Sequence, residues 1–176
     1  QFLNTNNQLI HINTSTSNIK LLVDSPAEVG ADRICNAVAA NKIDKGPSIV
    51  IDFGSATTFD IINKEGSFIG GAICPGMDIA ARNLLENAAL LSNVDFSFPE
   101  SVIGTSTETN LQSGIMYGTV TMVEGMIEMI IDELQEEPTN IIITGGFGEL
   151  IIRNLKPNYI YDPYLTLRGI DYIINP

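Results

Sequence analysis

Three segments rich in β-branched residues follow one another in the middle of the chain, and short turns separate them. These segments, 48–53, 57–62 and 68–74, have the composition of strands, and glycine with small polar residues occupies the gaps. Because such short turns join strands that run in opposite directions, the segments predict an antiparallel meander. The rest of the chain must then supply the elements that cover this sheet.

Helical periodicity and two further strands account for most of the remaining sequence. Ser25-Pro26-Ala27-Glu28 has the pattern of a capping box with proline at the first helical position. Gly30 interrupts the helix expected there, and it marks either a helix break or a close approach by another group. The later elements are predicted as helices at 77–91, 109–135, 147–154 and 164–174 and as strands at 140–144 and 159–161. This order predicts an α/β fold in which helices flank a mixed sheet.

The composition restricts the partners of this 176-residue chain. Its net charge of −12 repels nucleic acid and anionic lipid, so we expect neither as a partner. No apolar run approaches the roughly 20 residues that cross a bilayer, so we expect no membrane span. Cys35, Cys74 and the single histidine, His11, are too few for a disulfide framework or a typical structural zinc site. We expect a cytoplasmic protein.

The segment from Val50 to Asp60 carries the clearest chemical signal. A strand ends in Asp52, the glycine turn at Gly54 follows, and hydroxyl side chains from Ser55 onward lead into the next strand. A carboxylate beside N–H and hydroxyl donors suits a cation and a phosphate together. A hairpin whose polar side chains merely satisfy the turn backbone explains the same residues equally well.

Two further places have residues suited to a binding site. Asp32 and Arg33 are adjacent near a helix start, where one can take a proton from a hydroxyl and the other can bind a carboxylate. A surface ion pair, or an acidic residue that favours the helix dipole, explains them as well. Gly145 and Gly146 follow a predicted strand and would let a base or a phosphate approach the backbone, although a plain strand-to-helix turn has the same sequence.

Taken together, these motifs resemble those of the type III pantothenate kinases, which belong to the actin-like ATPase superfamily. The resemblance extends from about Pro26 to Ile174, and its strength comes from several weak motifs in the correct order. The motifs are residues 28–33, 52–58, 70–76, 104–107, 112–114, 144–146 and 165–169.

The resemblance implies a fold, an activity and a set of ligands. The fold is the actin-like ATPase, or ribonuclease H-like, fold. The activity is ATP-dependent phosphorylation of pantothenate, the first step of coenzyme A biosynthesis. The ligands are pantothenate, ATP with Mg²⁺, and a monovalent cation, K⁺ or NH₄⁺, and the protein is expected to be a homodimer.

Roles for individual residues also follow from the resemblance. Asp32 matches the general base, and Asp52 matches a ligand of the monovalent cation. Ser55 stands where the family usually has threonine, so the hydroxyl that contacts ATP is kept. The residues matched to pantothenate are Gly30, Ala31, Asp32, Arg33 and Thr107. The residues matched to ATP are Gly54, Ser55, Gly145 and Gly146.

One family motif is missing, because no Asp-x-Gly-Asn-Thr phosphate loop occurs in this sequence. We therefore expect residues 1–47 to be a remnant of the N-terminal half that includes the acceptor-binding helix. Residues 48–176 are then the C-terminal actin-like ATPase subdomain, and the isolated chain is expected to be inactive as a kinase. Two alternatives stay open: a noncatalytic relative that acts as a transcriptional accessory factor, or an actin-like scaffold that binds nucleotide. The segment 30–33 favours a kinase, because a scaffold has no use for an acceptor site.

Overall fold

The computed structural model describes residues 2–5, 8–87 and 95–176, and its centre is a five-stranded mixed sheet. The strand order is β5-β4-β3-β6-β7. The first three strands form the predicted antiparallel meander, while β6 runs parallel to β3 and β7 runs parallel to β6. The strands are β3 (Ser48–Phe53), β4 (Ala56–Ile62), β5 (Phe68–Pro75), β6 (Asn140–Gly145) and β7 (Ile160–Tyr161). The predicted α/β class with a mixed sheet is confirmed.

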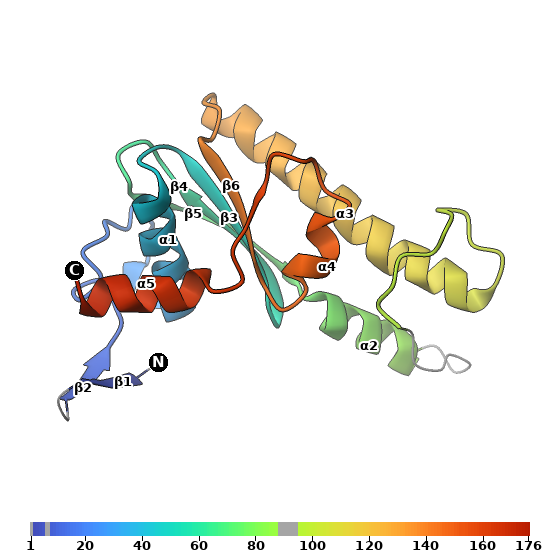
Figure 1. Ribbon diagram of the computed structural model, residues 1–176, viewed down its shortest axis with the longest axis horizontal. Helices are drawn as coiled ribbons and strands as arrows, with labels where there is room; N and C mark the ends of the chain where they lie inside the picture. The colour runs from blue at the N-terminus through green and yellow to red at the C-terminus, as the bar shows by residue number, and fades with distance from the viewer. Residues whose placement is uncertain (1, 6–7, 88–94) are drawn as a thin grey trace.

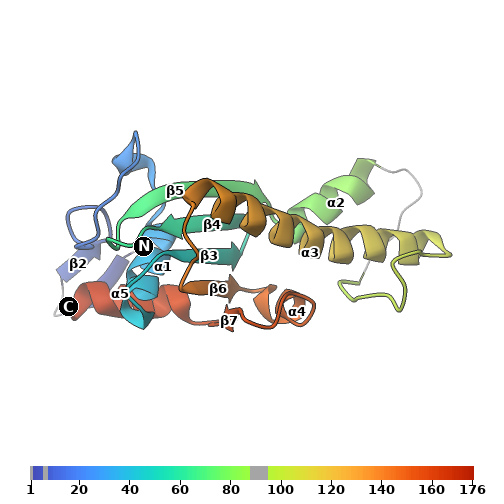
Figure 2. The same cartoon turned by 90° about the horizontal axis from the view of Figure 1, so that it is seen from above.

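Helices lie on both faces of this sheet (Figure 1). One face is covered by α1 (Ala31–Ile43) and α5 (Leu165–Ile174), and the other by α3 (Thr107–Leu134) and α4 (Gly148–Ile152). The remaining helix, α2 (Met77–Asn87), continues beyond the end of β5 (Figure 2). The predicted continuation of α2 through residues 88–91 lies outside the described residues.

Along the central strands, successive side chains point to opposite faces of the sheet and belong to two different hydrophobic clusters. Val50 and Ile62 belong to the cluster under α1 and α5. Ile49 and Ile51 belong to the cluster under α3, together with Met116 of that helix. This alternation follows from the two-residue period of a strand, and it decides which polar side chains of β3 and β4 face α1.

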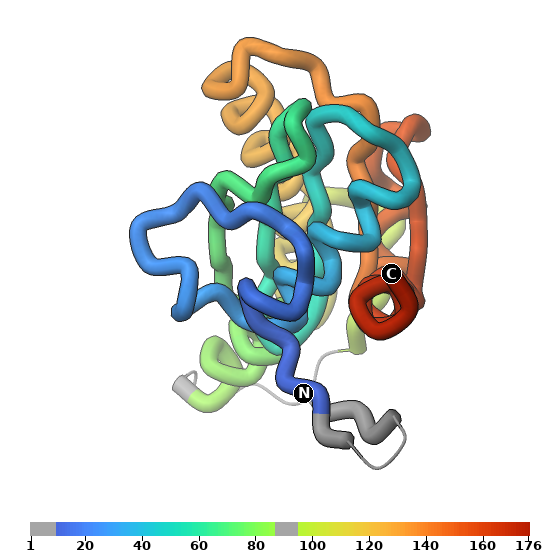
Figure 3. Tube along the Cα trace, turned by 90° about the vertical axis from the view of Figure 1, so that its left-hand side faces the viewer, coloured from blue at the N-terminus to red at the C-terminus, as the bar shows by residue number. Residues whose placement is uncertain are grey.

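The N-terminal segment adds a small hairpin and a short turn to this core. Strands β1 (Phe2–Thr5) and β2 (Gln8–His11) pair with each other in a separate two-stranded sheet. Figure 3 shows the segment that follows them passing in front of the sheet at the end where α1 lies. Helix α1 shares a cluster with Val50 and Leu165, so it packs on the same sheet as later elements. The domain boundary after residue 47 stays a prediction.

The start of α1 differs from the sequence expectation. Ser25 makes no side-chain capping bond, and Pro26–Glu28 forms only one 3-10 turn, η1. The backbone then becomes extended at Val29, and α1 begins at Ala31 with Gly30 as its N-cap. Gly30 therefore marks a helix break, and it also allows a close approach, because an added Cβ would lie 2.5 Å from Asp32 Oδ1.

Helix α3 bears on the expectation that the chain has no membrane span, which stays a prediction. Among the described helices it is the one with the length and hydropathy to cross a membrane, although no uninterrupted apolar run of that length exists. Length and composition are the only basis for this finding, and core helices of globular proteins meet the same criterion. Met116, Val123 and Ile127 of α3 are buried against the sheet, whereas Leu111 and Ile115 stay half-exposed.

Candidate active site

The carboxyl ends of β3 and β6 and the first turns of α1 meet at one edge of the sheet. Asp52 and Phe53 close β3 beside Thr144 and Gly145 of the parallel strand β6. In open α/β sheets, ligands bind outside the carboxyl ends of parallel strands. This edge is therefore the place where the sheet itself favours a binding site.

Asp52 is half-buried and is held from the side of α1. Its Oδ2 accepts a hydrogen bond from Asn36 Nδ2 at 3.0 Å. Burial raises the pKa of Asp52, the hydrogen bond from Asn36 lowers it, and the negative charge of Asp32 raises it again. The net shift is upward, so the charge of this carboxylate is only partly compensated by its surroundings.

Gly145 lies directly against the carboxylate of Asp52. Its φ is +87°, and a Cβ atom built on it would lie 2.5 Å from Asp52 Oδ1 and 2.5 Å from the backbone nitrogen of Phe53. Only glycine accepts both the left-handed backbone and this close approach. Gly54 also comes close, because its own Cβ would lie 3.6 Å from Asp52 Oδ1. Two of the glycines matched to ATP therefore flank the carboxylate.

Asp52 is the residue at this edge that could hold a cation. Asp52 provides one desolvated carboxylate, and its Oδ1 faces the backbone of the turn at Gly145. Over residues 2–5, 8–87 and 95–176, no group of three or more His, Cys, Asp or Glu side chains is placed to hold a metal. Ca²⁺ and similar hard divalent cations use several oxygen ligands, often including more than one carboxylate. The single desolvated carboxylate of Asp52 could hold a cation of lower charge.

Asp32 stands in the first turn of α1 with an exposed side chain. Its Oδ1 accepts a hydrogen bond from the backbone N–H of Arg33 at 2.9 Å. Asp32 and Asn36 are four residues apart and so lie on one face of the helix. The negative charge of Asp32 raises the pKa of both Asp52 and Asp60.

Arg33 is held firmly against β4 and β5. Its Nε donates to Asp60 Oδ1 at 2.5 Å, and its Nη2 donates to the carbonyl of Phe59 at 3.3 Å. The guanidinium also lies over the ring of Phe68, 5.3 Å from its centroid. A Cβ on Gly71 would clash first with the backbone carbonyl of Phe59 and would also lie 3.0 Å from Arg33 Nη2, so glycine here allows the close approach of β4 and leaves room for the guanidinium. The Nε–Nη2 edge of Arg33 is thus occupied by the protein itself.

Asp60 is a site residue that the sequence analysis missed. It is fully buried on β4, and its Oδ2 has no hydrogen-bond partner among the described residues. Burial raises the pKa of Asp60 to about 7, and the adjacent Arg33 opposes this shift. The sequence does contain a signal that could have identified Asp60. It is an acidic residue between the apolar residues Phe59 and Ile61, in a segment predicted as a strand.

The remaining predicted residues lie around or away from this edge. Ala31 opens α1, Ser55 is exposed in the turn between β3 and β4, and Gly146 has open space around it. Thr107 is the first residue of α3. That end of α3 extends away from α1 in both Figure 1 and Figure 2. The chain therefore brings together Asp32, Asp52, Gly54 and Gly145 but leaves Thr107 apart.

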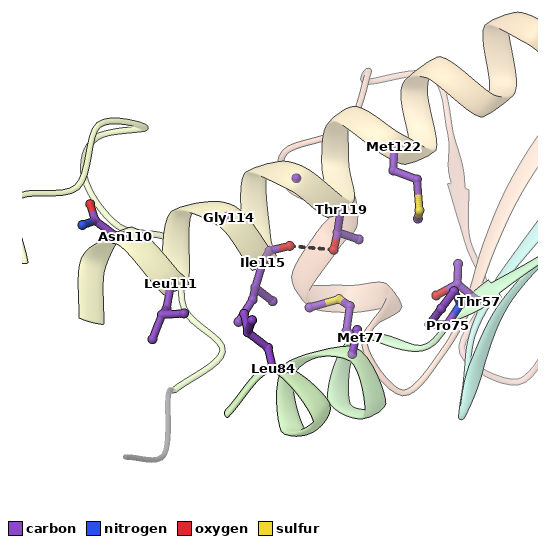
Figure 4. A pocket seen from close by; sticks show the side chains of 13 residues that line it. Thr57, Pro75, Met77, Leu84, Asn110, Leu111, Gly114, Ile115, Thr119 and Met122 are labelled. Carbon is purple, nitrogen blue, oxygen red and sulfur yellow. Dashed lines mark hydrogen bonds between the residues drawn. The ribbon is translucent and has the colours of Figure 1, made fainter. Parts of the chain in front are cut away.

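An apolar groove of about 490 Å³ lies between α2 and α3, away from the carboxylates. Figure 4 shows Leu84 and Met77 of α2 opposite Leu111 and Ile115 of α3. Neither Asp32 nor Asp52 lines it, so this hollow is a surface separate from the edge described above.

Comparison with known proteins gives a consistent assignment. The family model described as type III pantothenate kinase matches residues 1–129. A type III pantothenate kinase of Acidothermus cellulolyticus is 41% identical over 155 residues, which are 88% of this chain and 60% of that protein. One of Parafrankia sp. is 43% identical over 152 residues, 86% of this chain and 60% of that protein. The chain thus spans about 60% of the length of these relatives.

Solved structures show the same fold. A Campylobacter jejuni protein described as a Baf family transcriptional activator superposes with a TM-score of 0.62 at 24% identity, over 91% of this chain and 69% of that one. The Alp12 filament protein superposes with a TM-score of 0.51 at 15% identity, over 79% of this chain and 50% of that one. At these identities the likeness extends to the fold alone, and the predicted actin-like ATPase fold is confirmed.

Proposed function

Because this chain belongs to the type III pantothenate kinase family, we propose that it supplies the acceptor and cation sites of an enzyme that phosphorylates pantothenate with ATP. The observation that carries the proposal is the meeting of Asp32 and Asp52 at one edge of the sheet. Asn36, one turn after Asp32 on α1, donates to Asp52 at 3.0 Å. The helix that begins in the acceptor motif is thereby joined by a direct contact to the strand that leads into the nucleotide turn.

Asp32 acts as the general base in this proposal. Phosphoryl transfer depends mainly on positioning and charge stabilisation, and a carboxylate within reach of the acceptor hydroxyl takes its proton. The exposed side chain at the start of α1 is accessible to such a hydroxyl, and the N–H of Arg33 holds one of its oxygens. Arg33, fixed by Asp60, provides the positive charge for the carboxylate of pantothenate.

Asp52 holds the monovalent cation, K⁺ or NH₄⁺, and the turn residues face ATP, which arrives with Mg²⁺. When bound, the cation supplies positive charge beside the phosphates and offsets the partly desolvated carboxylate of Asp52. Gly54 and Gly145 let the phosphates approach the backbone, while Ser55 and Gly146 flank them from exposed positions.

The active protein is a homodimer in this proposal. Thr107 is matched to an acceptor contact, yet its own chain holds it away from Asp32. Gly114 and Gly118 have no atom within 4 Å of an added Cβ and line the apolar groove of α3. A second copy packed on this groove would cover the apolar surface beside the first turns of α3, and in this proposal Thr107 contacts the acceptor bound to that second copy.

We also propose that the protein acts in the cytoplasm. Both cysteines, Cys35 and Cys74, are free in the structure. Free thiols are the normal state of cysteine in a reducing compartment.

The test is the substitution Asp32→Asn in the protein that contains this chain. The amide keeps the shape of the side chain and removes the base, so kcat for pantothenate phosphorylation should fall by roughly 10²-fold or more. Pantothenate binding should change only modestly. Asp44→Asn, which alters the exposed C-cap of the same helix, is the matched control and should keep normal kcat. Near-normal kcat in Asp32→Asn would contradict the base assignment. A wild-type protein without ATP-dependent activity on pantothenate would instead favour an accessory or scaffold role.

A further inference from the structure

A chain of hydrogen bonds connects the last helix of the protein to Asp52. Thr166 Oγ1 of α5 donates to Asn36 Oδ1 at 2.7 Å, and Asn36 Nδ2 donates to Asp52 Oδ2 at 3.0 Å. Asn36 is almost completely buried, with 1% of its surface exposed. Both ends of its amide are therefore satisfied by the protein, one by a hydroxyl and one by a carboxylate.

This arrangement determines which way the amide of Asn36 points. A carboxylate can only accept, so the NH₂ end of Asn36 must face Asp52. The oxygen end must then face Thr166, whose hydroxyl can donate to it. Without that hydroxyl, the buried oxygen of Asn36 would lose its partner, and the amide would lose the bond that resists its rotation.

The packing of α5 on α1 explains how Thr166 reaches Asn36. Leu165 is fully buried in the cluster beneath these helices. Gly169, three residues after Thr166, lies on the backbone of Cys35, the neighbour of Asn36 in sequence. A Cβ on Gly169 would lie 2.5 Å from the carbonyl carbon of Cys35, so the two helices are in backbone contact here. The motif at residues 165–169 thus has a physical role: it docks α5 and presents Thr166.

We infer that Thr166 and Asn36 are positioning residues that orient Asp52 for the monovalent cation. Asn36 holds Oδ2, which leaves Oδ1 directed at Gly145 and Gly54, on the side of the nucleotide turn. A ligand fixed in this way binds an ion without first losing side-chain freedom. Partners that orient a metal ligand commonly change metal affinity by 10- to 100-fold when they are removed. The inference rests on the cation site of the proposed function.

The experiment measures cation binding through stability rather than through catalysis. The melting temperature of the protein is followed as KCl replaces tetramethylammonium chloride at constant ionic strength, since a ligand that binds only the folded state raises it. The wild type should show a saturable rise that Asp52→Ala abolishes. Thr166→Val, which keeps the shape but lacks the hydroxyl, should need about tenfold more K⁺ for half of that rise. Thr166→Ala, measured beside it, should shift in the same direction.

Two controls separate hydrogen bonding from packing. Thr166→Ser keeps the hydroxyl and should follow the wild-type K⁺ curve. Thr121→Val removes another helical hydroxyl, which donates to the carbonyl of Tyr117 in the same helix, and should also follow the wild-type curve. The inference is overturned if Thr166→Val follows the wild-type curve, or if Thr166→Ser shifts as far as Thr166→Val. If the wild type shows no K⁺-specific rise, or if Asp52→Ala keeps it, the cation site itself fails and the inference fails with it.

Discussion

The contact between α5 and α1 makes a sharp prediction for Gly169→Ala. In an ordinary helix this change stabilises, because alanine has a higher helix propensity than glycine by about 1 kcal/mol. At this position the added Cβ would lie 2.5 Å from the carbonyl carbon of Cys35 and 2.8 Å from its Cα, and closer still to the carbonyl oxygen. All three atoms belong to backbone, so no side-chain rotation can relieve the clash.

The magnitude follows from the two opposing contributions. Overpacking of a close contact typically costs 1–3 kcal/mol, and a clash with backbone belongs at or above the top of that range. After subtraction of the propensity gain of about 1 kcal/mol, Gly169→Ala should lower the free energy of unfolding by roughly 2 kcal/mol. For a protein of this size, that corresponds to a melting temperature about 4–8 °C lower.

Gly125→Ala is the matched control. Gly125 lies inside α3, and nothing lies within 4 Å of the Cβ that it would gain. The propensity gain is then unopposed, and the melting temperature should rise by about 2–4 °C. Thermal unfolding followed by circular dichroism measures both variants under one condition. If Gly169→Ala stabilises the protein as Gly125→Ala does, α5 does not lie on α1 as described, and the contact of Thr166 with Asn36 is refuted as well.

Two further predictions concern the pair formed by Arg33 and Asp60. Arg33→Lys should raise KM for pantothenate far more than KM for ATP, with a loss on the order of 1–3 kcal/mol, because lysine keeps the charge but not the planar geometry. An acceptor that lacks the carboxylate should bind the wild type and Arg33→Lys equally well. If the substitution changes KM for pantothenate and KM for ATP equally, Arg33 has a structural role instead. Asp60→Asn should change how stability depends on pH, because burial raises the pKa of Asp60 to about 7. Between about pH 4 and pH 7 the folded state keeps a proton that the unfolded state has lost, so this carboxyl group reduces stability as pH rises. Urea titrations measure the free energy of unfolding of the wild type and of Asp60→Asn. The difference, wild type minus variant, should fall from about pH 4 to pH 7 and stay level above about pH 7. A difference that is the same at every pH would contradict this.

Local sequence patterns predicted most of the secondary structure correctly, and the roles of the site residues stay predictions. The β-branched segments around Ile49 and Phe59 became β3 and β4, because alternating apolar side chains can be buried on both faces of a covered sheet. Asp52 lies at the end of its strand, as predicted. The start of α1 was placed too early, because a proline and a possible cap at Ser25 favour only one turn when the backbone at Val29 is extended.

The contacts that complete the candidate site could not be predicted from the sequence. Arg33 and Asp60 are 27 residues apart, and Asn36 and Thr166 are 130 residues apart. A motif records the residue types at a position but not which side chain from a distant element will face it.

The glycines illustrate the same division most clearly. The sequence identifies Gly145 and Gly169 as members of motifs, and local rules allow a turn at one and predict a weakened helix at the other. Only the packed structure shows that Gly145 accommodates the carboxylate of Asp52, while Gly169 accommodates the backbone of Cys35. Periodicity and turn chemistry act between neighbours in the chain, so the sequence determined the elements and their order. Close approach and hydrogen-bond pairing depend on distances in space, so the tertiary structure alone decided which residues surround Asp52.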